Sequence, residues 1–242
     1  MKEIKKSVIL FLLFVNFLYA GDMYDFESTN SEEKTLYSSK KELFKVREEI
    51  KKAIQKSENI PFFWNSLGKT YLYGFNFKDG FVAAEPKKAE IYFKKAYELG
   101  DVNSYYLMIV ASLSSGEVSK SLFLLDQALI ELSSEINENP TSLKRYTLYA
   151  HLYMSVVIEN NMQIKYIHKA IDYGYILATK YEDRVAQIEI ATLYRMLNKE
   201  ETAKYFYKLA CLDNDQENKK VDAFCRENVE IVFKKKTAQV AR

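Results

Sequence analysis

Apolar residues recur along this 242-residue chain at the three- and four-residue spacing of amphipathic helices, whereas strand-like alternation is not sustained anywhere. Seven glycines and three prolines punctuate the sequence, which is typical of helices joined by short turns. The first stripe predicts an amphipathic helix over residues 31–57, with Lys and Glu on its polar face. Pro61 follows it, and the residue before a proline avoids helical geometry. We therefore expect an all-α fold.

Four later segments share one pattern, in which small and aromatic residues stand at similar offsets. The first segment has Trp64, Leu67, Gly68 and Tyr71, then Ala89, Phe93 and Ala96. The fourth has Gln187, Ile190, Ala191 and Tyr194, then Ala203, Tyr207 and Ala210. Small residues allow helices to approach closely, and aromatic side chains fill the grooves beside them. We predict pairs of antiparallel helices stacked in series.

Turn residues predict where these helix pairs begin and end. In the first pair, we expect a loop over residues 75–85 with a turn at Asp79-Gly80, a second helix from Pro86, and a left-handed cap at Gly100. The second pair turns at Gly116. The third turns near residues 160–161 and closes at Gly174, and the fourth runs over residues 177–212. A last amphipathic helix beyond Asp215 is expected to cover the end of the stack.

The N-terminus has the three parts of a secretory signal peptide. Three lysines lie within residues 2–6, residues 8–19 are apolar apart from Asn16, and Ala20 precedes a polar segment. The apolar run is shorter than the roughly 20 residues that a helix needs to span a bilayer. We expect residues 1–20 to be cleaved, the alternative being an uncleaved anchor. The expected destination is the periplasm, with full secretion as the other option.

Cleavage of residues 1–20 would change the net charge of the chain. The whole sequence has 35 Lys and Arg against 33 Asp and Glu, and residues 1–20 hold three of these Lys and one Glu. The remaining chain is formally neutral and lacks the long-range attraction for phosphates that nucleic-acid binders use. We therefore expect no nucleic-acid partner. The basic run at residues 234–236 is interpreted as a solvated tail.

The sequence contains two cysteines, Cys211 and Cys225, both in its C-terminal part. In an exported chain the oxidising compartment favours a disulfide between them. Closing a loop of about 15 residues stabilises a fold by roughly 3 kcal/mol in the chain-entropy model. The alternative is a pair of buried, reduced thiols.

The repeated pattern resembles the tetratricopeptide repeat family, and in particular its Sel-one-like subtype. The stretches that carry the resemblance are LGKTYLYG at residues 67–74 and KAEIYFKKAYELG at residues 88–100. The resemblance extends over residues 62–212 and is strongest in the first and fourth segments. It implies a right-handed α-solenoid of about four helix-turn-helix repeats over residues 61–212. An N-terminal segment with the long helix (21–60) precedes this domain, and a capping helix with a basic tail (213–242) follows it.

The resemblance also implies a site. Members of the family bind an extended peptide or a protein element in a concave groove lined by the first helix of each pair. We expect cationic members of this face to meet carboxylates and aromatic members to supply apolar contact. The alternative is that they are ordinary, partly exposed helix residues. The positions are Asn65, Lys69, Tyr73, Tyr106, Val110, Thr147, His151, Met154, Ile188, Thr192 and Arg195. The Cys211 segment is similar to disulfide-bearing secreted members of the subtype.

Residues with catalytic potential are scarce. His151 and His168 are the only histidines, and they fall on different helices of their pair, so we expect each to be satisfied or solvated rather than to share a metal. No Gly-x-Ser-x-Gly motif and no glycine-rich phosphate loop occurs. We predict no catalytic residue, no metal site and no cofactor.

These observations lead to two hypotheses of different class. The first is a non-enzymatic, exported helical-repeat protein that binds a protein or peptide partner in its groove, as an adaptor or scaffold in the cell envelope. The second, implied by the disulfide-bearing relatives, is a binder of cell-wall peptides or β-lactam-like ligands with weak hydrolase activity. Secretion to act on host proteins is a third option.

Overall fold

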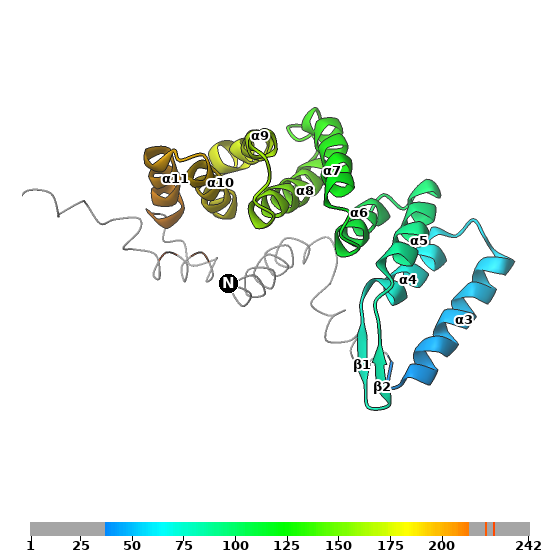
Figure 1. The fold of residues 1–242 in the computed structure, drawn as a ribbon. Coiled ribbons are helices and arrows are strands. Elements are labelled where there is room, and N and C mark those ends of the chain that lie inside the picture. The colour runs from blue at the N-terminus through cyan, green and yellow to red at the C-terminus, as the bar shows by residue number, and fades with distance from the viewer. Residues whose placement is uncertain (1–36, 213–220, 222–224, 226–242) are drawn as a thin grey trace, which may run out of the picture. The chain divides into compact units, whose positions relative to one another are not determined.

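The computed structural model describes residues 37–212 together with Val221 and Cys225 (Figure 1). Within these residues it contains nine α-helices and one two-stranded hairpin, which confirms the all-α prediction. The chain divides into two compact units, and the boundary lies between Ile130 and Glu131. Among the described helices, none combines the length and the apolar character that crossing a membrane requires.

The first unit, in its described part, comprises residues 37–130. Its elements are α3 (Lys40–Lys56), α4 (Pro61–Leu72), β1 (Phe75–Phe77), β2 (Gly80–Val82), α5 (Pro86–Glu98), α6 (Ser104–Ser114) and most of α7 (Val118–Ser133). The second unit continues from Glu131. Its elements are the end of α7, then α8 (Pro140–Glu159), α9 (Ile164–Lys180), α10 (Arg184–Met196) and α11 (Glu200–Leu212).

Helix α3 begins later than the hydrophobic stripe predicted. Residues 37–39 are not helical, and residues 31–36 lie outside the described part. The Ser39 hydroxyl accepts a hydrogen bond from the Glu42 backbone N–H at 3.3 Å, and the Glu42 carboxylate accepts one from the Ser38 backbone N–H at 2.7 Å. This exchange is close to a capping box, which satisfies N–H groups that have no partner inside the helix. The cap therefore fixes the start of α3 at Lys40.

Helices α3, α4 and α5 pack around one apolar cluster. Leu67 and Tyr71 of α4, Phe93 of α5 and Ile54 of α3 are all buried in it. A Cβ atom added to Gly68 would lie 2.7 Å from Cε1 of Phe93, so α4 and α5 approach too closely for a larger side chain. The first helix pair is thus built as the alternation of small and aromatic residues predicted.

A buried arginine holds α3 against α4. The Arg47 Nε atom donates to the Thr70 hydroxyl at 3.2 Å, and its Nη2 atom donates to the Thr70 carbonyl. The guanidinium carbon lies 3.9 Å from the centre of the Tyr71 ring, within the range of a cation–π contact. Burial lowers the pKa of Arg47, but arginine stays protonated in proteins. The N-terminal helix therefore belongs to the first unit.

The connection between α4 and α5 is a hairpin where the sequence predicted a loop. Strands β1 and β2 are antiparallel, with Phe75 opposite Val82 and Phe77 opposite Gly80. The turn expected at Asp79-Gly80 is present, and Gly80 has φ of +118°. The Phe75 ring meets Tyr37 edge-on at 5.7 Å between ring centres, which places the hairpin beside the start of α3.

The predicted helix ends are mostly confirmed. Gly100 and Gly116 adopt the left-handed backbone region with φ of +98° and +85°, and Asn161 does so with φ of 46°. The predicted end at Gly174 is wrong: α9 continues through it to Lys180. A Cβ atom at Gly174 would overlap Sδ of Met154, so this glycine permits close packing of α8 and α9 instead of ending a helix. The fourth pair consequently starts at Arg184, not at residue 177.

The small residues of the pattern lie where helices touch. Gly68 is buried in its contact with Phe93, and the alanines of the pattern are fully buried. These alanines are Ala89, Ala96, Ala150, Ala191 and Ala203. The close-packing prediction is therefore confirmed in both units.

The disulfide prediction is also confirmed. Cys211 in α11 and Cys225 are joined, with their Cα atoms 5.6 Å apart. Val221 and Cys225 are helical and Val221 is buried, which agrees with the expected last helix at these two positions. The rest of that helix, the basic tail and the signal peptide lie outside the described residues.

Candidate functional site

In each unit the first helices of successive pairs lie in contact with one another. Helix α4 contacts α6 in the first unit, and α8 contacts α10 in the second. Helices α4, α8 and α10 also pack on the second helices of their pairs, which are α5, α9 and α11. The surface that two neighbouring first helices leave uncovered is the face on which the groove was predicted. The predicted groove residues lie on the four first helices, with Tyr73 directly after the end of α4.

On the face of α4 and α6, four of the five predicted residues keep some exposure. Tyr73, at the C-cap of α4, is exposed, while the other three are half-buried: Lys69, Tyr106 and Val110. Asn65 is buried instead. Its amide donates to the Asp101 carboxylate and to the Ser104 hydroxyl, both at 2.7 Å. It therefore joins α4 to the start of α6 and presents little surface to a partner.

On the face of α8 and α10, the predicted residues divide into two groups. Arg195 is exposed and three residues are half-buried: Thr147, Ile188 and Thr192. The Thr192 hydroxyl also shares a hydrogen bond with the Tyr207 hydroxyl at 3.1 Å. His151 and Met154 are buried, so neither offers its side chain to a partner at the surface. Met154 fills the space above Gly174.

His151 lies between two carboxylates inside the second unit. Its Nδ1 atom is 2.5 Å from Oε2 of Glu189, and its Nε2 atom is 3.1 Å from Oδ2 of Asp183. The Ser155 hydroxyl donates to the other oxygen of Glu189 at 3.1 Å. Asp183 is at the same time the N-cap of α10, accepting from the backbone N–H groups of residues 185 and 186. We call His151, Ser155, Asp183 and Glu189 the histidine cluster.

Electrostatics keep a proton inside the histidine cluster. Burial lowers the pKa of His151, but the attraction of Glu189 and Asp183 outweighs burial and raises the pKa to about 10. Burial raises the pKa of Glu189, and the charge on His151 opposes this rise. His151 is therefore an imidazolium that donates to a carboxylate from each ring nitrogen, which satisfies every polar hydrogen on the ring.

The histidine cluster has the residue types of a hydrolytic site but not their arrangement. A serine nucleophile needs a hydrogen bond to a base that can take its proton. Ser155 donates to Glu189, and both nitrogens of His151 are occupied by carboxylates. All four side chains are buried or nearly so. The geometry fits a polar link between α8 and α10 rather than catalysis.

The sequence did not point to Asp183 and Glu189 as partners of His151. Glu189 stands between Ile188 and Ile190, so a carboxylate within an apolar stretch of the helix was the available signal. Asp183 precedes the first helical residue, the usual place for an N-cap. His168 is exposed, which agrees with the prediction that it is either satisfied inside the fold or solvated. In the part of the chain that the structure describes, no group of three His, Cys, Asp or Glu side chains is placed to hold a metal ion.

Comparison with known proteins adds no family to this description. No protein-family model matches the sequence, and a search of curated proteins also finds no match.

Proposed function

We propose that this chain is a non-enzymatic, exported helical-repeat protein of the tetratricopeptide type, which binds a protein or peptide partner on the face formed by its first helices. Its role would be that of an adaptor or scaffold in the cell envelope. The observation that supports the proposal best is the contact between successive first helices, α4 with α6 and α8 with α10. Such contacts produce continuous helix faces, which is how helical-repeat proteins build extended binding surfaces.

The chemistry of these faces suits a peptide with carboxylates and apolar side chains. Tyr73, directly after α4, and Tyr106 of α6 supply aromatic surface, and Lys69 of α4 supplies an ammonium group. Arg195 supplies a guanidinium on α10, and arginine can bind a carboxylate through two parallel hydrogen bonds. Aromatic residues and arginine are enriched among residues that contribute most of the binding energy at protein interfaces.

A paired charge reversal tests this proposal. The variant Lys69→Glu with Arg195→Glu is compared with Lys199→Glu with Lys208→Glu, which makes the same change of charge at two exposed lysines that are not on the predicted faces. Tagged versions of both are recovered from envelope fractions, after thermal melts have shown that both are folded. We expect a partner of the wild type to be lost from the first variant and kept by the second.

Equal recovery by both variants, or no enriched partner with the wild type, would contradict the proposal. A parallel thermal-shift measurement with cell-wall peptides addresses the alternative ligand class. A shift there that Lys69→Glu and Arg195→Glu abolish would assign the same faces to a cell-wall ligand instead of a protein.

A further inference from the structure

Positive charge is concentrated on two helices of the first unit that pack around the same apolar cluster. Helices α3 and α5 together hold eleven Lys and Arg against five Glu. The chain without residues 1–20 is formally neutral, so this excess is a local property of these helices. Of the eleven basic residues only Arg47 is buried, while the ten lysines extend from the helices toward solvent.

Large apolar side chains stand among these lysines. Phe44 of α3 is 49% exposed and Ile91 of α5 is 66% exposed. Each has a lysine three residues before it, Lys41 and Lys88, on the same side of its helix. Helix α7 repeats the arrangement with Phe123, which is 61% exposed and follows Lys120 by three residues. One exposed apolar residue and one preceding lysine thus recur on three helices.

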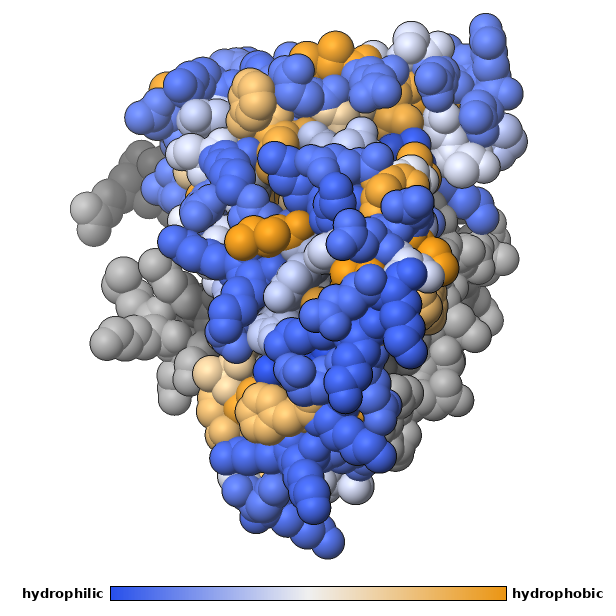
Figure 2. Space-filling view, turned by 90° about the vertical axis from the view of Figure 1, so that its right-hand side faces the viewer, coloured by the Kyte–Doolittle hydropathy of each residue, from blue (hydrophilic) through white to orange (hydrophobic). Residues whose placement is uncertain are grey.

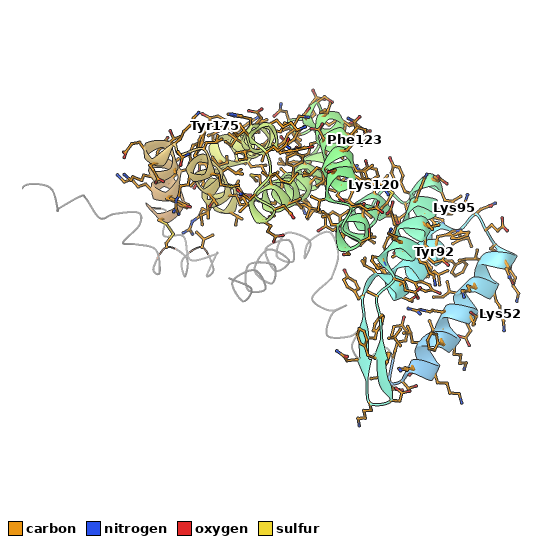
Figure 3. The ribbon with its side chains drawn as sticks, in the orientation of Figure 1. Lys52, Tyr92, Lys95, Lys120, Phe123 and Tyr175 are labelled. Atoms are coloured by element: carbon orange, nitrogen blue, oxygen red, sulfur yellow. A yellow bond between two sulfur atoms is a disulfide. The ribbon has the colours of Figure 1, made fainter. Side chains whose placement is uncertain are left out.

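The three helices are neighbours on one side of the first unit. Ile50 of α3 and Tyr92 of α5 pack against the same apolar cluster. The ammonium of Lys120 in α7 is 2.5 Å from the carboxylate of Glu90 in α5. In Figure 3, the labelled Lys52, Lys95 and Lys120 come from α3, α5 and α7 and lie along the same side of the ribbon. We call the exposed side of these three helices the lysine face.

The ion pairs on the lysine face leave it positively charged. Six lysines of this face pair with glutamates, and most of the paired side chains are exposed. These lysines are at positions 45, 51, 87, 88, 95 and 120. Exposed pairs of this kind contribute little free energy, so a lysine can exchange its partner for another anion. Lys41, Lys52, Lys56 and Lys94 make no ion pair with any described residue.

We propose that the lysine face docks on an anionic phospholipid bilayer. Lysines near such a surface are attracted to lipid phosphates, while exposed Phe and Ile side chains enter the boundary between headgroups and acyl chains. This attachment goes beyond the proposed partner binding, because it uses α3, α5 and α7 and not the faces of α4 and α6. It would hold the first unit at the membrane with its first helices still available.

The distribution of apolar side chains favours a bilayer over an acidic polypeptide. A bound helix buries a continuous apolar stripe, and a bound strand uses a free sheet edge. Phe44, Ile91 and Phe123 instead come from three separate helices with charged residues around them. Figure 2 looks onto the side where α3 lies in Figure 1 and shows separate apolar patches surrounded by hydrophilic residues. A bilayer surface can accept such side chains one at a time.

Vesicle co-sedimentation tests the proposal directly. The chain lacking residues 1–20 is mixed with vesicles of phosphatidylcholine that contain phosphatidylglycerol, and with vesicles of phosphatidylcholine alone. We expect binding to the first kind only, weakening as salt is raised. The variant Lys41→Gln, Lys52→Gln, Lys94→Gln should bind about fivefold more weakly for each lysine removed. The variant Ile91→Ser should bind about tenfold more weakly.

Matched controls come from the second unit. Lys165→Gln, Lys199→Gln, Lys208→Gln removes three exposed lysines there, and Ile164→Ser changes an isoleucine that is 64% exposed. Both controls should bind vesicles like the wild type. Failure of the wild type to bind anionic vesicles, or equal losses in test and control variants, would overturn the proposal. Retention of polyglutamate without vesicle binding would also overturn it and assign the lysine face to an acidic polypeptide. These results are independent of partner recovery through Lys69 and Arg195.

Discussion

His151 is a residue type common in active sites, but in the histidine cluster its contacts are those of a structural link. His151 carries a charge in the interior of the second unit, where an isolated ion would be strongly destabilised. Glu189 and Asp183 compensate this charge from α10, so the imidazolium becomes a specific link between two first helices. Breaking such a buried pair typically costs about 3–5 kcal/mol, because it leaves a charge without a partner.

The pKa of His151 predicts how the stability of the second unit depends on pH. Its value of about 10 in the folded chain lies above the ordinary 6.5, so the folded state binds the proton more tightly. The contribution of His151 is therefore complete below pH 6.5 and is lost as the pH rises toward 10. We expect the free energy of unfolding, measured with urea across this range, to fall by at most about 1.4 kcal/mol per pH unit.

The two histidines supply a matched pair of variants for this experiment. His151→Gln should flatten the decline between these pH values, whereas His168→Gln, at an exposed position, should leave it unchanged. A decline that persists in His151→Gln would show that other groups carry it.

A second residue-scale prediction concerns the closest helix contact of the last pair. Ala203 of α11 is fully buried, so Ala203→Phe should overpack the α10–α11 contact and lower the unfolding free energy by about 1–3 kcal/mol. Lys208→Phe adds the same ring at an exposed position of α11 and should change it by less than about 0.5 kcal/mol. Equal melting of the two variants would contradict the packing described for this pair.

At the scale of elements, α3 is joined to α4 by the polar contacts of one buried side chain, in addition to apolar packing. Arg47 links it to both oxygen atoms of Thr70 and to the Tyr71 ring. We expect Arg47→Met to lower the free energy of opening α3 by about 1.5–3 kcal/mol, the range for a hydrogen bond to a charged group. Hydrogen exchange should quicken in residues 40–56 and stay unchanged in α8–α11.

Two further variants sharpen the α3 test. Arg47→Lys should not rescue the loss, because an ammonium cannot reproduce the fork of the guanidinium. Lys45→Met removes a lysine whose side chain is 74% exposed and should leave exchange in α3 unaltered. Slow exchange of α3 in Arg47→Met would show that apolar packing alone holds the helix.

The disulfide gives the second prediction at this scale. Reduction of Cys211–Cys225 should lower the unfolding free energy by about 3 kcal/mol, since it frees a loop of about 15 residues in the unfolded chain. The variant Cys211→Ser with Cys225→Ser should melt like the reduced protein and show no response to reductant. Two titratable thiols in the untreated, folded protein would contradict the pairing.

Elements that depend on local pattern could be predicted from the sequence, and those that depend on distant contacts could not. Pro86, Gly100 and Gly116 mark helix limits by their own backbone preferences, and their predictions are confirmed. Gly174 has the same residue type, but its role is set by Met154 twenty residues earlier. The hairpin escaped prediction because three-residue strands are too short to show an alternating pattern.

The candidate site also depends on contacts between residues that are distant in sequence. The family resemblance placed His151 on the face of the first helices, but the structure buries it against Glu189 and Asp183, which lie more than thirty residues away in sequence. Eight of the eleven predicted positions keep some exposure and remain as candidates, among them Lys69, Tyr106 and Arg195. The lysine face could not be recognised from the net charge of the chain, because acidic residues elsewhere cancel the excess of lysine on α3 and α5.

At the scale of the whole molecule, the two proposed surfaces have separate tasks. The first helices would bind a protein or peptide, and α3, α5 and α7 of the first unit would attach to lipid. Each unit is folded around its own contacts, so a variant in one unit is a fair control for the other. The proposed function depends on the claim that the face of the first helices is where a partner binds, whereas the membrane attachment is independent of that claim.

Photo-crosslinking in living cells tests that claim most directly. A photoreactive phenylalanine is placed at Tyr106 on α6, and in a separate strain at Tyr205, a tyrosine that is 57% exposed on α11. The account predicts one dominant protein adduct from position 106 that Lys69→Glu weakens, and no such adduct from position 205. The same adducts from both positions, or an adduct from position 205 alone, would contradict it.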